Sequence, residues 1–222
     1  MRENVMEDRG VLMAYFPFYI DLKGRKCLVV GGGKVALRKI QTLLQFEAEV
    51  KVIGSRISDA IRSLAETGRL TYEKRPYQCG DVSGFFLAIA ATSTPEINDL
   101  ICRDAGEWKV WVDSATHPEK CSFIFPAVVK KGDLVIGLTS SGKYPALTRL
   151  LKQKIAALPV LAQAGGLEKW AVWRRRIQKE VSDPRERERI LREIGAEIID
   201  HPEADPEEFI PRIAGVKQDE KN

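Results

Sequence analysis

Three consecutive glycines, Gly31 to Gly33, follow a short apolar run and precede Lys34, Val35 and Ala36. In this G-x-G-x-x-A pattern Gly31 permits a tight turn, Gly33 lets the backbone approach a pyrophosphate, and the alanine lets a helix pack closely on a strand. Free amides at the helix start favour an anion. The sequence therefore predicts a dinucleotide site at Gly31, Gly33, Lys34 and Val35, with a simple turn before a helix as the alternative.

The next predicted strand ends without the acidic residue that often accepts the ribose hydroxyls of a dinucleotide. Gly54, Ser55 and Arg56 stand there instead, and Ser55 and Arg56 are candidate cofactor contacts. Arg56 can pair with a 2′-phosphate or be a solvated surface charge. The residues themselves therefore leave the choice between NAD and NADP open.

Asp113 follows the apolar residues Val110 to Val112, which predict a strand. Ligands bind at the carboxyl ends of strands in an open parallel sheet, and a carboxylate there can accept a proton from a substrate. The alternative is an aspartate that caps a turn through its own side chain. The catalytic hypothesis requires Asp113 to face an open cavity near the glycine turn.

These residues must be positioned by a sheet whose strands alternate with helices. Strands are predicted at 26–30, 50–53, 70–73, 85–91 and 110–112, and the intervening apolar residues keep helical spacing. The continuous apolar run 85–91 is typical of a strand covered on both faces. The pattern predicts a Rossmann-like, doubly wound α/β domain over about residues 15–120.

After Cys121 the pattern changes to two apolar runs, 123–129 and 134–138, joined by the turn 130–133. This predicts a β-hairpin. A helix is then expected to begin at Tyr144 and Pro145. Further helices are expected from Leu161, and a loose tail after Pro211. We therefore divide the chain into residues 1–121, a hairpin region 122–158 and a helical segment 159–222.

Composition excludes several classes of protein. The 222 residues carry a net charge of +4 and are 44% hydrophobic and 30% charged, which indicates neither a nucleic-acid partner nor a membrane segment. The four cysteines form no C-x-x-C pair, so we expect reduced, packed thiols without a metal site. The mixed charges before Val11 do not resemble a secretory signal, and the predicted location is the cytoplasm.

Several blocks of the sequence closely resemble the precorrin-2 dehydrogenase and sirohydrochlorin ferrochelatase family, in the form of the stand-alone amino-terminal module of siroheme synthase. The resemblance covers about residues 15–160. The matching blocks are residues 15–39, 87–92 with Asn98, Asp113 with Pro118, Cys121, Phe123, Pro126 and Ala127, and finally 140–142, 145–147 and 149–150. Val110, Ser93 and Thr94 depart from residues common in this family.

The resemblance implies a fold of three parts and a reaction that passes a hydride from precorrin-2 to NAD, forming sirohydrochlorin. Some members also insert ferrous iron into that product. Asp113 matches the essential aspartate, and Thr92 is placed at the cofactor. Because the substrate is a polycarboxylate, Ser140, Lys143 and Arg149 are candidate substrate contacts.

The resemblance also implies a homodimer formed through the hairpin region. The chain leaves no room for the methyltransferase domain of fused siroheme synthases, and residues 1–12 are expected to be a dispensable extension. Two other functions stay open: a non-enzymatic NAD-sensing regulatory module, and a chelatase whose main role is metal insertion.

Overall fold

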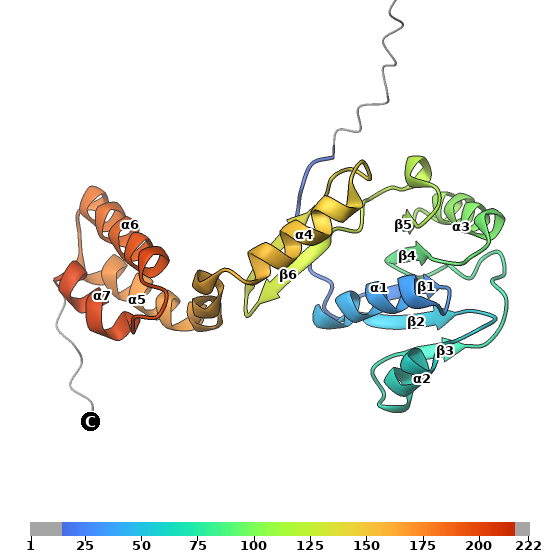
Figure 1. The fold of residues 1–222 in the computed structure, drawn as a ribbon, viewed down its shortest axis with the longest axis horizontal. Coiled ribbons are helices and arrows are strands. Elements are labelled where there is room, and N and C mark those ends of the chain that lie inside the picture. Colours follow the sequence, from blue (N-terminus) through green and yellow to red (C-terminus); the bar gives the residue numbers. More distant parts are fainter. Residues whose placement is uncertain (1–14, 216–222) are drawn as a thin grey trace, which may run out of the picture. The chain divides into compact units, whose positions relative to one another are not determined.

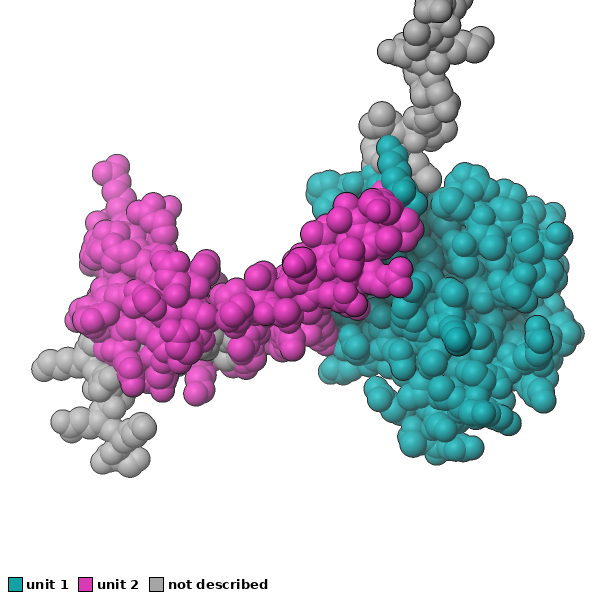
Figure 2. Space-filling model, viewed as in Figure 1, with its two compact units in different colours: residues 1–126, 141–143 teal, residues 127–140, 144–222 magenta. Residues whose placement is uncertain are grey.

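The computed structural model describes residues 15–215. They form two compact units, one of residues 15–126 with 141–143 and the other of residues 127–140 with 144–215 (Figure 2). The division into 1–121, 122–158 and 159–222 stays a prediction. The expected extension 1–12 lies outside the described residues.

A five-stranded parallel sheet forms the centre of the first unit (Figure 1). Its order is β3-β2-β1-β4-β5, so β1 and β4 lie inside the sheet. This confirms the Rossmann-like α/β fold. The strands are β1 (Lys26–Val30), β2 (Glu49–Ile53), β3 (Thr71–Glu73), β4 (Leu87–Ala90) and β5 (Trp111–Ser114).

Several strand boundaries differ from the sequence prediction by one or two residues, and the largest differences are in β4 and β5. β4 starts at Leu87 because the N–H of Phe85 donates to the carbonyl of Val82 in a turn, which keeps Phe85 out of the ladder. β5 extends to Ser114, and Asp113 pairs in register with Ile89 of β4. Asp113 is therefore part of a strand, and the prediction that it follows the strand is wrong.

Helices cover both faces of the sheet. On one face α1 (Lys34–Gln45) and α2 (Asp59–Glu66) bury Ile40 and Ile61 with Val29 and Val52 in one core. On the other face α3 (Pro95–Glu107) buries Ile101 in a second core. Alternating side chains of the central strands supply both cores, as expected of a parallel sheet covered on two sides.

The segment after β5 covers part of the sheet face on which α1 lies. Phe123 and Phe125 pack against the core that α1 and α2 share. The predicted strand 123–129 therefore begins only at Ala127. Pro126 has no N–H to donate to a ladder, and the aromatic residues before it are used as a cover for the sheet.

The second unit begins with an antiparallel hairpin of β6 (Ala127–Lys131) and β7 (Leu134–Leu138), which confirms the predicted hairpin. Gly132 in its turn has a φ of +54°, and a Cβ there would lie 2.8 Å from the carbonyl oxygen of Ala164. α4 (Pro145–Ala156) contacts β6 and buries none of its residues fully. Leu147, Leu150 and Leu151 of α4 are exposed.

The rest of the second unit is helical. It consists of the 3₁₀ segment η2 (Pro159–Gly166), α5 (Leu167–Glu180), α6 (Pro184–Asp200) and α7 (Pro206–Ala214). Trp173, Ile194 and Ile210 are among the residues of its core. Because α7 continues through Pro211 to the buried Ala214, the prediction of a loose tail directly after Pro211 is wrong.

Candidate dinucleotide site and buried carboxylate

Gly31 forms the tight turn at which the candidate cofactor site begins. It directly follows β1, has a φ of +126°, and donates its N–H to the carbonyl of Ile53 at 2.8 Å. A Cβ at Gly31 would collide with the carbonyl of Ala91, with the backbone nitrogen of Thr92 also close. Both the conformation and the space require glycine. The turn thus meets the ends of β2 and β4.

Gly32 is a required glycine that the sequence pattern treats as variable. A Cβ there would collide with the carbonyl oxygen of Arg56 and approach Ile57 Cα within 2.8 Å. The carbonyl of Gly32 accepts the N–H of Ser58 at 3.1 Å. The glycine triplet itself was the signal, because three glycines exceed what the dinucleotide pattern needs.

Gly33 differs from its neighbours because its side-chain direction is open. It has an extended conformation at the amino end of α1, and a Cβ there would have no atom within 4 Å. Gly33, Lys34 and Val35 are exposed, and no side chain caps the helix. These residues fit a pyrophosphate, which would use the free amides of the helix start and the space beside Gly33.

The loop after β2 presents Ser55 and Arg56 to solvent. The backbone of Arg56 packs on Gly32, so the structure brings this predicted contact to the glycine turn. Glu73 ends the neighbouring strand but is ion-paired with Lys51 and Arg75. Hydrogen bonds from Lys51 and then Arg75 lower the pKa of Glu73. The Glu73 carboxylate is therefore already ion-paired with two neighbouring cations.

Thr92 lies at the end of β4, beside Gly31, where Asn98 holds it. Asn98 is fully buried; its Oδ1 accepts from the N–H and hydroxyl of Thr92 at 3.0 and 2.8 Å. The Asn98 amide donates to the carbonyl of Thr92 and to the hydroxyl of Thr116 at 3.2 and 3.1 Å. Asn98 therefore joins the loops that follow β4 and β5.

Asp113 is buried, which contradicts the expectation of an open carboxylate. It is 7% exposed; its Oδ2 lies 2.5 Å from Lys39 Nζ, and its Oδ1 accepts the N–H of Phe125 at 3.1 Å. The extension of β5 explains this result, because alternation along the strand turns Asp113 toward the face covered by α1. The carboxylate is still linked to the cofactor site, since Lys39 belongs to the helix that begins after Gly33.

Lys39 is the site residue that sequence reasoning missed. It is buried on the same face of α1 as Ala36, Ile40 and Leu43, and its Nζ lies 4.5 Å from the ring centroid of Phe125. The spacing of Lys39 in the sequence was the available signal: it lies three residues after Ala36 and four residues before Leu43, and both of these apolar residues are buried. Its partner could not be found locally, because Asp113 is 74 residues away.

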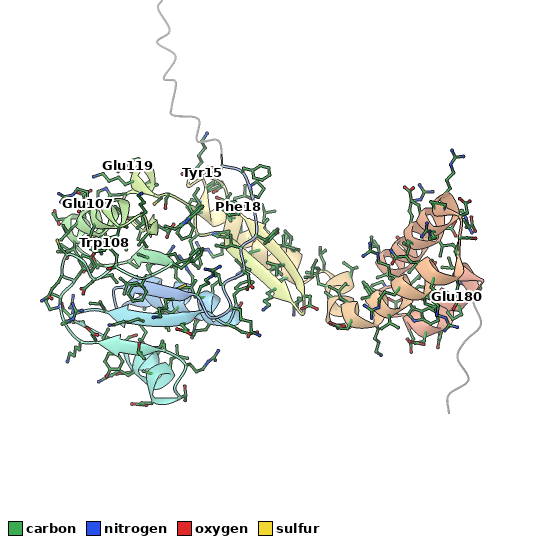
Figure 3. The ribbon with its side chains drawn as sticks, turned by 180° about the vertical axis from the view of Figure 1, so that it is seen from behind. Tyr15, Phe18, Glu107, Trp108, Glu119 and Glu180 are labelled. Carbon is green, nitrogen blue, oxygen red and sulfur yellow. The ribbon has the colours of Figure 1, made fainter. Side chains whose placement is uncertain are left out.

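Tyr15 and Cys121 also lie near the carboxylate. Burial raises the pKa of Tyr15, and the charges of Cys121 and Asp113 raise it further. Burial raises the pKa of Cys121 to about 11, against a hydrogen bond from the backbone of Ser114. Tyr15 and Phe18 belong to the segment before β1 (Figure 3), and the Phe18 ring lies 5.8 Å from that of Trp111.

The thiols provide a direct test of this packing. Cys79 is exposed, so the expectation that every cysteine is packed is wrong, although all four are free. Burial raises the pKa of Cys27 to about 12 and that of Cys121 to about 11. Both stay protonated at pH 8, and thiolate is the reactive form. Iodoacetamide at pH 8 should therefore label Cys79 first, as mass spectrometry can verify; rapid labelling of Cys121 would contradict the packing.

The comparisons with known proteins cover both the glycine turn and Asp113. Residues 18–127 match the family model described as "Putative NAD(P)-binding". The siroheme synthase of Photobacterium profundum is 38% identical over 146 residues, which are 66% of this chain and 31% of that protein. The siroheme synthase of Azotobacter vinelandii is 41% identical over 143 residues, 64% of this chain and 31% of that one. Residues 18–127 belong to this NAD(P)-binding family, and the chain is similar to siroheme synthases over about two thirds of its length.

The fold agrees with this family. "SirC, precorrin-2 dehydrogenase" superposes with a TM-score of 0.70 at 23% identity, covering 90% of this chain and 100% of that one. The expectation of a nicotinamide dinucleotide cofactor agrees with the NAD(P)-binding family match and with the glycine turn. The chain spans about a third of the length of the siroheme synthases that it matches.

Some predicted features of this family member belong to the second unit. Ser140 and Arg149 lie there, whereas Lys143 is assigned to the first unit. Ser140 Oγ accepts the N–H of Tyr144 at 3.1 Å, while Lys143 and Arg149 are exposed. Substrate binding by these three residues stays a prediction.

Between residues 15 and 215 no group of three or more His, Cys, Asp or Glu side chains is arranged to hold a metal ion. Within the same range no helix is both long and apolar enough to span a membrane.

Proposed function

We propose that this chain catalyses the NAD-dependent oxidation of precorrin-2 to sirohydrochlorin. The observation that carries the proposal is an open dinucleotide turn at Gly33, with a carboxylate, Asp113, ion-paired to the helix that follows the turn. Both features lie within the matched residues 18–127. The similar proteins are named siroheme synthase and precorrin-2 dehydrogenase, and we take the substrate and the pathway from these names.

The reaction removes a hydride and a proton from the macrocycle. NAD, when bound, accepts the hydride. The amides of Gly33, Lys34 and Val35 bind the pyrophosphate, and Thr92 lies beside the turn, where Asn98 orients it. Asp113 accepts the proton, which then passes to solvent.

The buried position of Asp113 adds a requirement to this mechanism. A general base must come within hydrogen-bond distance of the proton that it abstracts. Asp113 instead contacts Lys39 and the backbone of Phe125. The segment around Phe125 or the lysine side chain must therefore move when the substrate binds, and the ion pair must open.

The substrate carries several carboxylates, so cations are needed to bind it. Lys143 and Arg149 are exposed and available for this role, and Ser140 can donate a hydrogen bond. We assign these three residues to substrate binding. The free cysteines agree with a reducing compartment, and we place the reaction in the cytoplasm.

The decisive experiment incubates the purified chain with precorrin-2 and NAD and follows sirohydrochlorin and NADH. Formation of both in equal amounts is expected. NAD binding without turnover, under conditions in which an active precorrin-2 dehydrogenase works, would favour the non-enzymatic sensor. A parallel assay with sirohydrochlorin and ferrous ion, with and without NAD, tests the chelatase activity that the family resemblance implies.

We also propose that the chain is a homodimer. Leu147, Leu150 and Leu151 expose 44%, 57% and 43% of their surface on one helix, α4, and an apolar face of this kind needs a cover. Leu150→Glu should convert dimers into monomers, as measured by light scattering at micromolar concentration. Lys152→Glu, a charge change on an exposed residue of α4, is the control. A wild-type protein that is already monomeric would contradict the proposal.

A further inference from the structure

The ion pair between Lys39 and Asp113 is buried at a place where apolar side chains would suffice. Its side chains are 10% and 9% exposed, and they lie on the sheet face that carries Val29 and Ile89. A buried pair loses the hydration of both ions, and well-packed apolar residues often replace such a pair without loss of stability. The contribution of such a pair to stability therefore does not by itself account for its presence.

The other titratable groups that face Asp113 come from three segments. They are Tyr15 before β1, Cys102 in α3 and Cys121 after β5. Burial favours the neutral form of each, and none of them can carry a positive charge. The positive charge beside the carboxylate is thus supplied by Lys39, while the N–H of Phe125 holds the second oxygen.

The position of Lys39 along α1 connects the pair to the cofactor site. Lys39 is five residues after Lys34, the first residue of the helix, which corresponds to about 7.5 Å along its axis. The helix start is the predicted pyrophosphate site. A rigid helix therefore fixes the lysine, and through it the carboxylate, relative to the dinucleotide.

We infer that Lys39 is a positioning residue that holds the Asp113 carboxylate in one orientation until the substrate arrives. The inference rests on the proposed function. In the reaction two bonds from the macrocycle to hydrogen break: one hydrogen leaves as a hydride, which NAD would accept, and the other leaves as a proton, which forms a new O–H bond on the Asp113 carboxylate. Because Lys39 contacts Oδ2 and the N–H of Phe125 donates to Oδ1, both oxygens of the carboxylate are held in place before the substrate binds.

The test compares kcat and KM of Lys39 variants at pH 7. Lys39→Met removes the contact to Oδ2 and leaves only the N–H of Phe125 to orient the carboxylate. At pH 7 kcat should fall and KM should stay unchanged. Lys39→Arg, which can still donate a hydrogen bond to Oδ2, should restore kcat. Lys51→Met is the matched control, because Lys51 forms an ion pair of the same length, 2.5 Å, with the partly exposed Glu73.

A second measurement separates this inference from the proposed function. The carbon-13 signal of the Asp113 carboxyl, assigned by its loss in Asp113→Asn, reports the surroundings of the carboxylate without substrate. At pH 7 this signal should shift or broaden in Lys39→Met, and in Lys39→Gln if the methionine variant does not fold. An unchanged signal overturns the inference whatever the activity. A changed signal in a protein that does not oxidise precorrin-2 would contradict the proposed function but support the positioning of Asp113 by Lys39.

Discussion

Asp113→Asn should lower kcat for precorrin-2 oxidation about a hundredfold or more, because a general base commonly contributes a factor of about 10² to 10⁴. Asparagine has nearly the same shape and can still accept the N–H of Phe125, but it cannot take up a proton at neutral pH. The affinity for NAD should be unchanged, because the glycine turn is not altered. Steady-state kinetics and calorimetric titration with NAD measure the two effects.

The same substitution should destabilise the fold, and this effect must be separated from catalysis. Asp113→Asn leaves the Lys39 ammonium buried without a counter-ion, which typically costs about 3–5 kcal/mol. The double variant Asp113→Asn with Lys39→Met removes both charges and should recover most of the free energy of unfolding. It should stay inactive. If the double variant regained turnover, Asp113 would not be the proton acceptor.

Gly33→Val should abolish measurable NAD binding while leaving the free energy of unfolding nearly unchanged. The backbone of Gly33 has an ordinary extended conformation, and its Cβ would point into open space, so the fold tolerates a side chain. The same side chain would occupy the space into which the pyrophosphate must come. Calorimetric titration with NAD, together with thermal unfolding, separates these effects.

Gly31→Ala provides the matched comparison. At Gly31 a Cβ collides with the carbonyl of Ala91, and the φ of +126° is unfavourable for alanine. We expect this variant to lose stability, by about 1–3 kcal/mol if overpacking dominates, as well as NAD affinity. If Gly33→Val bound NAD as tightly as the wild type, the dinucleotide would not cross the open start of α1, and the proposed site would be wrong.

The substitutions with the largest expected effects, at Asp113, Gly33 and Gly31, all lie in the first unit. The second unit has a separate organisation. Gly132 packs its turn on the backbone of Ala164, so the hairpin and η2 form part of one compact unit. Trp173 and Ile210 then give the helical segment a core of its own. The residues after the hairpin therefore pack around a core of their own, which is separate from the two cores of the sheet.

Short-range patterns in the amino-acid sequence were enough to predict much of the fold. The alternation of strands and helices, the hairpin and the turn at Gly31 follow from the period of apolar residues and from the conformational freedom of glycine, which act over a few residues. Boundaries were harder to predict: Phe123 and Phe125 resemble a strand, but they cover the sheet because Pro126 interrupts the ladder.

The state of Asp113, by contrast, follows from long-range packing. Its sequence neighbours predict a strand end and an open carboxylate, whereas the extension of β5 and the packing of α1 place it beside Lys39. The two residues are 74 positions apart, and no local pattern specifies which lysine meets which carboxylate. Such a pair depends on strand register and helix packing together, and these are set by the burial of the whole core.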